Sequence, residues 1–169
     1  MFLDESGCNT DMTRRYAYSL GGSRAVDSAP LSKPKNTTIL SSIQLDGTLR
    51  YTTFSGGTTV ERFKRYLETD LLPHLNGNSV LIMDNMKSHH AKAVKNLLDS
   101  SEIRYISLPP YSPDLNPIEK LWSKVKSFLR KFKARTLDAL PNTIQCAFQT
   151  VSPSDCSGWF HSRGYSPYF

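Results

Sequence analysis

The sequence predicts an α/β fold in which one mixed sheet carries helices on both faces. In the first half of the chain, two β-rich runs, 37–45 and 48–54, are separated by Asp46-Gly47, a dipeptide typical of tight antiparallel hairpins. In the second half, apolar runs of strand length alternate with segments of helical periodicity, which indicates parallel strands joined by helices. A chain of 169 residues can form one such domain and is short for two, so we expect residues 1–169 to be a single domain.

The N-terminal Met1-Phe2-Leu3 predicts the end of an apolar strand that stops at Asp4. The turn-prone Glu5-Ser6-Gly7 follows, so we expect a short strand that pairs weakly and holds Asp4 at a frayed end. Residues 10–35 are polar and rich in turn formers, which predicts an irregular segment in which only 15–19 could form a short strand.

After the hairpin, a helix is predicted from a cap at Thr58 or Thr59 to Pro73, because its apolar positions recur at helical spacing. Residues 79–83 form a continuous apolar run that ends at Asp84, as expected of a strand buried on both faces.

The next helix is expected to be capped by Ser88 and to extend through Leu98, and the strand after it to cover 103–108. A proline-rich loop leads to a helix that begins at Pro117, where the missing amide hydrogen costs nothing. The apolar stripe of this helix consists of Ile118, Leu121, Trp122, Val125, Leu129 and Phe132.

A last helix is predicted at about 137–151, although Pro141 must lie in its first turn or break it. This order of elements is compatible with a ribonuclease H-like layout and with other mixed folds, so the functional residues must decide between them.

Composition favours a folded protein with a polyanionic partner. The apolar fraction of 38% and the aromatic fraction of 11% exclude a disordered chain. The formal net charge is +6 and the pI about 9.3. A local basic segment fits nucleic acid better than a diffuse excess of charge does. It comprises Lys120, Lys124, Lys126, Arg130, Lys131, Lys133 and Arg135.

No apolar stretch approaches the length of a membrane-spanning helix, and the N-terminus lacks a basic leader, so we expect a cytoplasmic protein with no membrane partner. The cysteines Cys8, Cys146 and Cys156 lack CxxC spacing and zinc-finger histidines, and we expect them to be buried free thiols.

Acidic residues at the ends of buried strands are the usual ligands of a two-metal site, because ligands must converge from a rigid sheet. Asp4 and Asp84 both occupy such positions, and hard oxygen ligands favour Mg²⁺ or Mn²⁺ over zinc. Taken singly, Asp84 could equally be a turn or cap residue, and Asp4 a polar residue near a terminus.

Glu119 has two interpretations. With Asn116 as the cap, Glu119 stands at the third helical position, where a glutamate can complete a capping box. Helix geometry also places Glu119 on the same side as Lys126 and Arg130, and Lys126 lies about 10 Å away, at a distance suited to a DNA phosphate leading into a metal site. A solvated helix face is the alternative interpretation of these cations.

Three sequence blocks resemble the mariner-type DDE transposases, especially the bacterial insertion-sequence branch. The blocks are FLDES at 2–6, LIMDN at 81–85 and LPPYSPDLNPIE at 108–119. The third block is the most specific, and thirty-four residues lie between Asp84 and Glu119, an interval typical of this superfamily.

The resemblance implies a ribonuclease H-like fold and metal-dependent phosphoryl transfer. Asp4, Asp84 and Glu119 would be catalytic and would hold two divalent metal ions, Mg²⁺ or Mn²⁺. The partners would be DNA, as transposon ends and as the target, and a second copy of the chain when the enzyme is active. The protein would then be associated with the nucleoid when bound to DNA.

Other candidate residues have weaker support. Asn85 could orient Asp84 or its metal, and His89 could contact a phosphate or a metal-bound water, although a turn asparagine and a histidine in the first turn of a helix are the alternatives. Lys126, Arg130 and Lys133 are the expected DNA-binding residues. Asn116 and Trp122 are expected to shape the helix start and the core rather than to carry chemistry.

The resemblance implies an N-terminal helix-turn-helix region in full-length members, and residues 1–169 do not contain one. We therefore expect the chain to be an excised domain, one frame of an element whose other frame encodes that region, or a remnant. A separately encoded or frameshift-fused helix-turn-helix would be needed to recognise specific ends. The alternative function is that of an inactive remnant that only binds DNA or dimerises. A nuclease acting on RNA–DNA hybrids is disfavoured by the third block.

Overall fold

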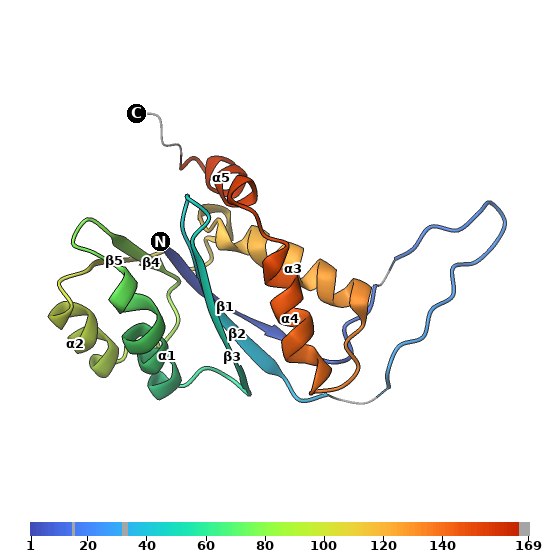
Figure 1. Ribbon diagram of the computed structural model, residues 1–169, viewed down its shortest axis with the longest axis horizontal. Helices are drawn as coiled ribbons and strands as arrows, with labels where there is room; N and C mark the ends of the chain where they lie inside the picture. Colours follow the sequence, from blue (N-terminus) through green and yellow to red (C-terminus); the bar gives the residue numbers. More distant parts are fainter. Residues whose placement is uncertain (15, 32–33, 166–169) are drawn as a thin grey trace.

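The computed structural model describes residues 1–14, 16–31 and 34–165. Its centre is a five-stranded sheet with the strand order β3-β2-β1-β4-β5. The strands are β1 (Phe2–Cys8), β2 (Thr37–Ile43), β3 (Leu49–Ser55), β4 (Val80–Met83) and β5 (Arg104–Ser107). The pairs β1–β2 and β2–β3 are antiparallel, while β1–β4 and β4–β5 are parallel. Helices cover both faces of this sheet (Figure 1), which confirms the predicted fold class.

β1 is longer and better supported than the sequence predicted. All seven residues pair with β2, and Asp4 lies opposite Ser41. The expectation of a three-residue strand followed by a turn was wrong because β1 is the central strand. Backbone hydrogen bonds from β2 hold 5–8 extended despite their low strand propensity. Asp4 therefore stands inside a paired strand, with 6% of its surface exposed.

The hairpin between β2 and β3 confirms the interpretation of Asp46-Gly47. Gly47 has a φ of 92°, a left-handed conformation that glycine adopts at little cost. A Cβ at this position would lie 2.8 Å from the Cα of Pro153, so the turn also needs glycine to pack against the start of the last helix.

One face of the sheet is covered by α1 (Val60–Tyr66) and α2 (Lys92–Ser100). The Thr59 side chain caps α1, as predicted, and a π-helical turn (Leu67–Leu71) and a 3-10 turn (Leu72–His74) continue it to the region of Pro73. The core on this side consists of Leu3, Leu40, Phe63, Tyr66, Leu67, Leu71, Leu81, Met83, Val94, Leu98 and Ile103.

α2 begins at Lys92, four residues after the predicted cap, and Ser88 does not cap it. The residues before it form turns instead, in which the amide of Met86 donates to Asp84 Oδ1. His89 is consequently buried beneath α1 and does not lie in the first turn of a helix.

The other face is covered by α3 (Ile118–Phe132), α4 (Ala139–Gln149) and α5 (Pro153–His161). A 3-10 turn (Pro113–Leu115) precedes α3, and Pro141 lies in the first turn of α4 and does not break it. The stripe of α3 is buried except at Phe132, which is 55% exposed.

The sequence analysis missed α5, although its start carries a clear signal. Ser152 and Asp155 form a capping box around Pro153 at the first helical position.

The segment between β1 and β2 extends away from the sheet (Figure 1). Its described part contains no strand, so the strand expected at 15–19 is absent from 16–19, and Arg15 lies outside the described residues. Both ends of this segment contact the residues that directly follow α3. The Arg135 guanidinium donates to the carbonyls of Thr10 and Met12, and Lys133 forms an ion pair with Asp27.

All three cysteines are free thiols, but only Cys8 and Cys156 are buried; Cys146 is exposed, contrary to expectation. Within the described residues, no helix has the length and apolar character needed to cross a membrane.

Candidate active site

Asp4, Asp84 and Glu119 line one pocket of about 400 Å³. Leu3 of β1 pairs with Met83, the last residue of the adjacent parallel strand β4, so Asp4 and Asp84 are the residues that follow this pair. Glu119 comes from the first turn of α3. The pocket is completed by Asn85, Met86, Leu108, Pro109, Pro110, Tyr111, Ser112, Pro113 and Asn116.

Asp4 is held by three N–H donors. The backbone amide of Glu5 donates to its Oδ1 at 2.7 Å. The Nδ2 of Asn116 and the Nε1 of Trp122 donate to its Oδ2 at 3.2 and 3.1 Å. Asn116 and Trp122 are each 4% exposed, so these contacts are shielded from water.

The pKa of Asp4 is raised from 3.8 to about 7. Burial is the main cause, because it disfavours the charged carboxylate. The hydrogen bonds from Glu5 and Trp122 oppose this effect, and the nearby charges of Asp84 and Glu119 add to it. The three carboxylates are thus close enough to feel one another's charge.

Asp84 is paired with His89. The His89 Nδ1 lies 2.7 Å from Asp84 Oδ1 and 3.4 Å from the backbone carbonyl oxygen of Asp84, to which its N–H can donate. The imidazole ring is 2% exposed and stacks on Phe63, with 4.1 Å between the ring centroids. Its Nε2 is buried and has no hydrogen-bond partner among the described residues. Asn85 lines the pocket and contacts His90 through its side chain rather than Asp84.

Glu119 does not form the capping box that was its alternative role. In a capping box the Glu119 side chain would accept from the backbone amide of Asn116, but that amide donates to the carbonyl of Pro113. Asn116 Oδ1 accepts from the amide of Ile118, so the asparagine serves both the helix start and Asp4.

As they stand, no three Asp, Glu, His or Cys side chains in the described ranges meet closely enough to ligate one ion. Asp84 is turned toward His89, and Asp4 toward Trp122 and Asn116. The chemistry of the pocket nevertheless fits a hard divalent cation. Three carboxylates line the same pocket, and their negative charges repel one another. A cation bound between them would offset that repulsion.

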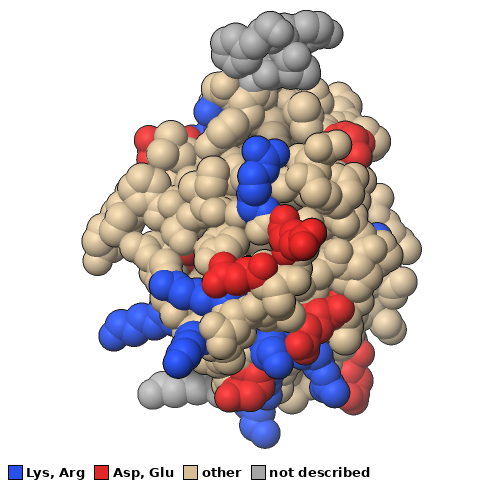
Figure 2. All heavy atoms as spheres, turned by 90° about the vertical axis from the view of Figure 1, so that its left-hand side faces the viewer, with Lys and Arg blue, Asp and Glu red and all other residues tan. Residues whose placement is uncertain are grey.

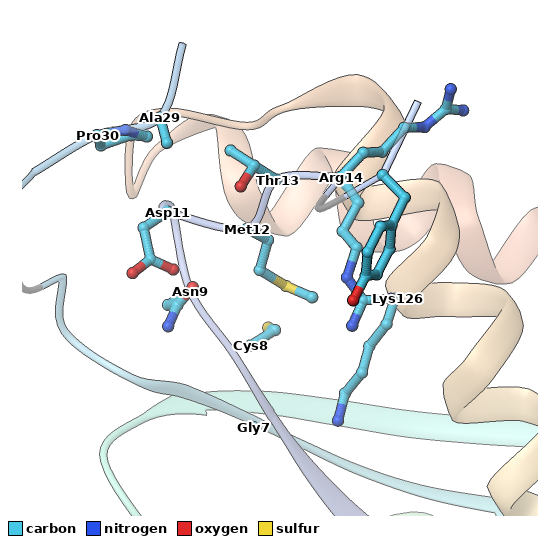
Figure 3. A pocket seen from close by; sticks show the side chains of 12 residues that line it. Gly7, Cys8, Asn9, Asp11, Met12, Thr13, Arg14, Ala29, Pro30 and Lys126 are labelled. Atoms are coloured by element: carbon cyan, nitrogen blue, oxygen red, sulfur yellow. The ribbon is translucent and has the colours of Figure 1, made fainter. Parts of the chain in front are cut away.

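A second cavity of about 850 Å³ lies further along β1 and α3. Lys126 extends into it from α3, opposite Asn9, Asp11 and Met12 (Figure 3). Arg130 and Arg14 also line it. The helix face predicted to be shared by Glu119, Lys126 and Arg130 therefore borders two cavities, while Lys133 is engaged with Asp27.

Sequence reasoning missed Asn116 and Trp122 as partners of Asp4. An apolar stripe accounts for the Trp122 ring, but a buried indole N–H also needs an acceptor, and that requirement was the available signal. Which acceptor it finds depends on how α3 packs on β1, and that cannot be obtained from spacing within one helix.

The sequence model of the family described as "DDE superfamily endonuclease" matches residues 1–141. The chain belongs to the DDE superfamily of endonucleases. Among its relatives, the transposable element Tc1 transposase of Caenorhabditis elegans is 27% identical over 120 residues, which cover 62% of this chain and 44% of the relative. The Tcb2 transposase of Caenorhabditis briggsae is 31% identical over 75 residues, which cover 44% of this chain and 28% of the relative. This chain therefore spans less than half the length of these relatives.

The fold of this DDE chain is also that of solved structures. A Mos1 transposase paired-end complex with the left transposon end superposes with a TM-score of 0.79 at 18% identity, covering 96% of this chain and 52% of that one. The Mos1 transposase catalytic domain, solved with Raltegravir and Mg, gives a TM-score of 0.68 at 16% identity and covers 99% of this chain and 85% of that one. These matches confirm the ribonuclease H-like fold that the resemblance implied.

Proposed function

We propose that this chain is the catalytic domain of a DNA transposase that cuts transposon ends and joins them to target DNA. The proposal rests on one observation: Asp4, Asp84 and Glu119 line the same pocket in a protein with this five-stranded sheet. The relatives matched by sequence are transposases, and Mos1 has been solved with a transposon end.

The three carboxylates are proposed to hold two divalent ions, Mg²⁺ or Mn²⁺. Mos1 paired-end complexes have been solved with each of these metals, and the all-oxygen donor set here suits either one. When bound, the metals would lower the pKa of an attacking oxygen and stabilise the leaving oxygen. The protein's part is to fix the ligands: Asp4 within a central strand, Asp84 directly after the neighbouring strand β4, and Glu119 on a helix packed on β1.

His89 is proposed to orient Asp84, because its Nδ1 lies close to one carboxylate oxygen and to the backbone carbonyl of Asp84, and Phe63 holds the ring in place. Replacing His89 with phenylalanine keeps the stacking and removes the donor. We expect cleavage of terminal-repeat DNA with Mn²⁺ to slow about 10-fold to 100-fold. His74, which is exposed in the 3-10 turn after α1, provides the control. A His89→Phe rate equal to that of His74→Phe would contradict the role.

Lys126 and Arg130 are proposed to bind the DNA backbone. The structure shows no ion pair for either side chain within the described residues. Both border the second cavity, and along α3 they lie about 10 Å (Lys126) and about 16 Å (Arg130) from Glu119. Lys133 is proposed as a weaker contact, because it would first have to leave Asp27.

Alanine at Lys126 should weaken DNA binding to the same extent for all sequences and reduce the slope of log affinity against log salt by about 1. Fluorescence anisotropy at several salt concentrations measures both effects. Lys95→Ala is the matched control because Lys95 lies on α2, on the side of the molecule where basic and acidic side chains are intermixed (Figure 2). Equal slopes for the two variants would exclude Lys126 as a phosphate contact.

Recognition of specific ends is proposed to come from a helix-turn-helix region supplied by a further segment or partner polypeptide, and the active form is proposed to be a homodimer. Less than half of each matched relative is represented by this chain, which supports the first proposal. Action on DNA would place the protein at the nucleoid.

The function is tested by incubating the chain, alone and fused to an end-binding region, with terminal-repeat DNA and Mn²⁺. We expect metal-dependent nicking at the transposon end. Folded protein that nicks in neither form would refute the proposal, and tight DNA binding without nicking would identify a catalytically silent binding module. Cleavage of RNA–DNA hybrids alone would identify a different nuclease of the same fold.

A further inference from the structure

Asp4 is the most constrained of the three carboxylates. Two of its three donors come from α3, which carries Glu119, and from the turn that leads into α3. Asn116 stands two residues before α3, and Trp122 lies on the second turn of the helix. Their N–H groups meet at a single oxygen, Asp4 Oδ2, at 3.2 and 3.1 Å. Both side chains are nearly inaccessible to water, so no solvent molecule can replace either donor without a shift of α3.

The hydrogen bonds to Asp4 leave one acceptor position of its carboxylate free. A carboxylate oxygen offers two lone pairs. Both lone pairs of Oδ2 are used by Asn116 and Trp122, whereas Oδ1 accepts only from the amide of Glu5. The remaining lone pair of Asp4 is therefore on Oδ1.

We propose that Asn116 and Trp122 are positioning residues that fix Asp4 by Oδ2, so that the carboxylate takes up a divalent ion through Oδ1 alone. This inference rests on the proposed function, because it assumes that Asp4 is a metal ligand. The same two contacts couple Asp4 to Glu119, since both ends of the pocket then depend on the placement of one helix.

Trp122→Phe tests the proposal because phenylalanine keeps an aromatic ring in the core and removes the Nε1–H. Mn²⁺ binding to the chain without DNA is measured by isothermal titration calorimetry. Donors behind metal ligands contribute 10-fold to 100-fold in affinity, so we expect Mn²⁺ binding to weaken about tenfold. Trp159→Phe is the matched control, because Trp159 also packs on the core of this face and makes no side-chain hydrogen bond within the described residues.

Asn116→Ser is the second variant, in case Trp122→Phe does not fold. Serine keeps an oxygen that can accept from the amide of Ile118 and is too short to replace the Nδ2 donor at Asp4. We expect it to weaken Mn²⁺ binding about tenfold as well. Raising the Mn²⁺ concentration should restore cleavage by either variant, which a general loss of packing would not allow.

The outcomes separate the two proposals. Weaker Mn²⁺ binding in Trp122→Phe or Asn116→Ser, with Trp159→Phe unchanged, supports the positioning role. Wild-type affinity in folded Trp122→Phe and Asn116→Ser overturns it and leaves the metal site intact. A wild-type chain that binds no Mn²⁺ overturns the metal site and the positioning role together.

Discussion

Replacing Asp84 with asparagine should lower the rate of DNA cleavage at least about a thousandfold. Asparagine has nearly the same shape and leaves the backbone carbonyl of residue 84 available to the His89 Nδ1, so the turn after β4 should persist. The negative charge is lost, however, and with it most of the attraction for a divalent ion. The rate is measured on terminal-repeat DNA with saturating Mn²⁺, and DNA binding is measured separately to show that it is unchanged.

Asp99→Asn is the control for this loss. Asp99 lies on α2, away from the pocket, and accepts from the Tyr105 hydroxyl, a bond that asparagine can keep. We expect wild-type cleavage from this variant. If Asp84→Asn cleaved as fast as Asp99→Asn, Asp84 could not be a metal ligand.

The parts of the fold that the sequence predicted well are those that local physics decides. Asp46-Gly47 forms its hairpin because the turn conformation is intrinsic to the dipeptide. Thr59 caps α1, and the apolar stripe of α3 faces the core. In each case the decisive interactions span only a few residues along the chain.

The incorrect predictions concern segments whose conformation depends on distant partners. Glu5-Ser6-Gly7 is turn-prone by itself and becomes a strand because β2 pairs with it from more than thirty residues away. Ser88 suits a helix cap, but the turn around His89 takes its place because His89 packs on Phe63 and pairs with Asp84.

In the candidate site, too, some features were predicted from local sequence and others depend on distant contacts. The spacing and motifs around Asp84 and Glu119 identified residues that the structure brings into one pocket with Asp4. The sequence could indicate that a buried Trp122 indole needs an acceptor, but not that Asp4 accepts from Trp122 and Asn116, because those contacts join residues more than a hundred positions apart.

Replacing Asp4 with asparagine should make the stability of the chain less dependent on pH when divalent metal is removed with a chelator. The pKa of Asp4 is about 7 in the folded protein and 3.8 when unperturbed, so its contribution to stability is fully present below about pH 4. As the pH rises to 7, the unfolded chain gives up this proton and the folded chain keeps it, and the contribution is lost. Each unit of pKa difference corresponds to about 1.4 kcal/mol, so the wild type should lose up to about 4 kcal/mol relative to Asp4→Asn between pH 4 and 7.

Urea unfolding of both proteins at pH 4, 5.5, 7 and 8, with chelator, measures this difference. The difference in unfolding free energy between the two proteins should grow from pH 4 to 7 and then level off. Above the folded pKa, Asp4 of the wild type is ionised in both the folded and the unfolded chain. A constant difference over this range would mean that Asp4 ionises normally and is not shielded by Trp122 and Asn116. Adding Mn²⁺ at pH 8 should stabilise only the wild type, since a bound cation compensates the buried charge that asparagine lacks. The carboxylate that destabilises the chain at neutral pH would then be the one that links its folding to metal binding.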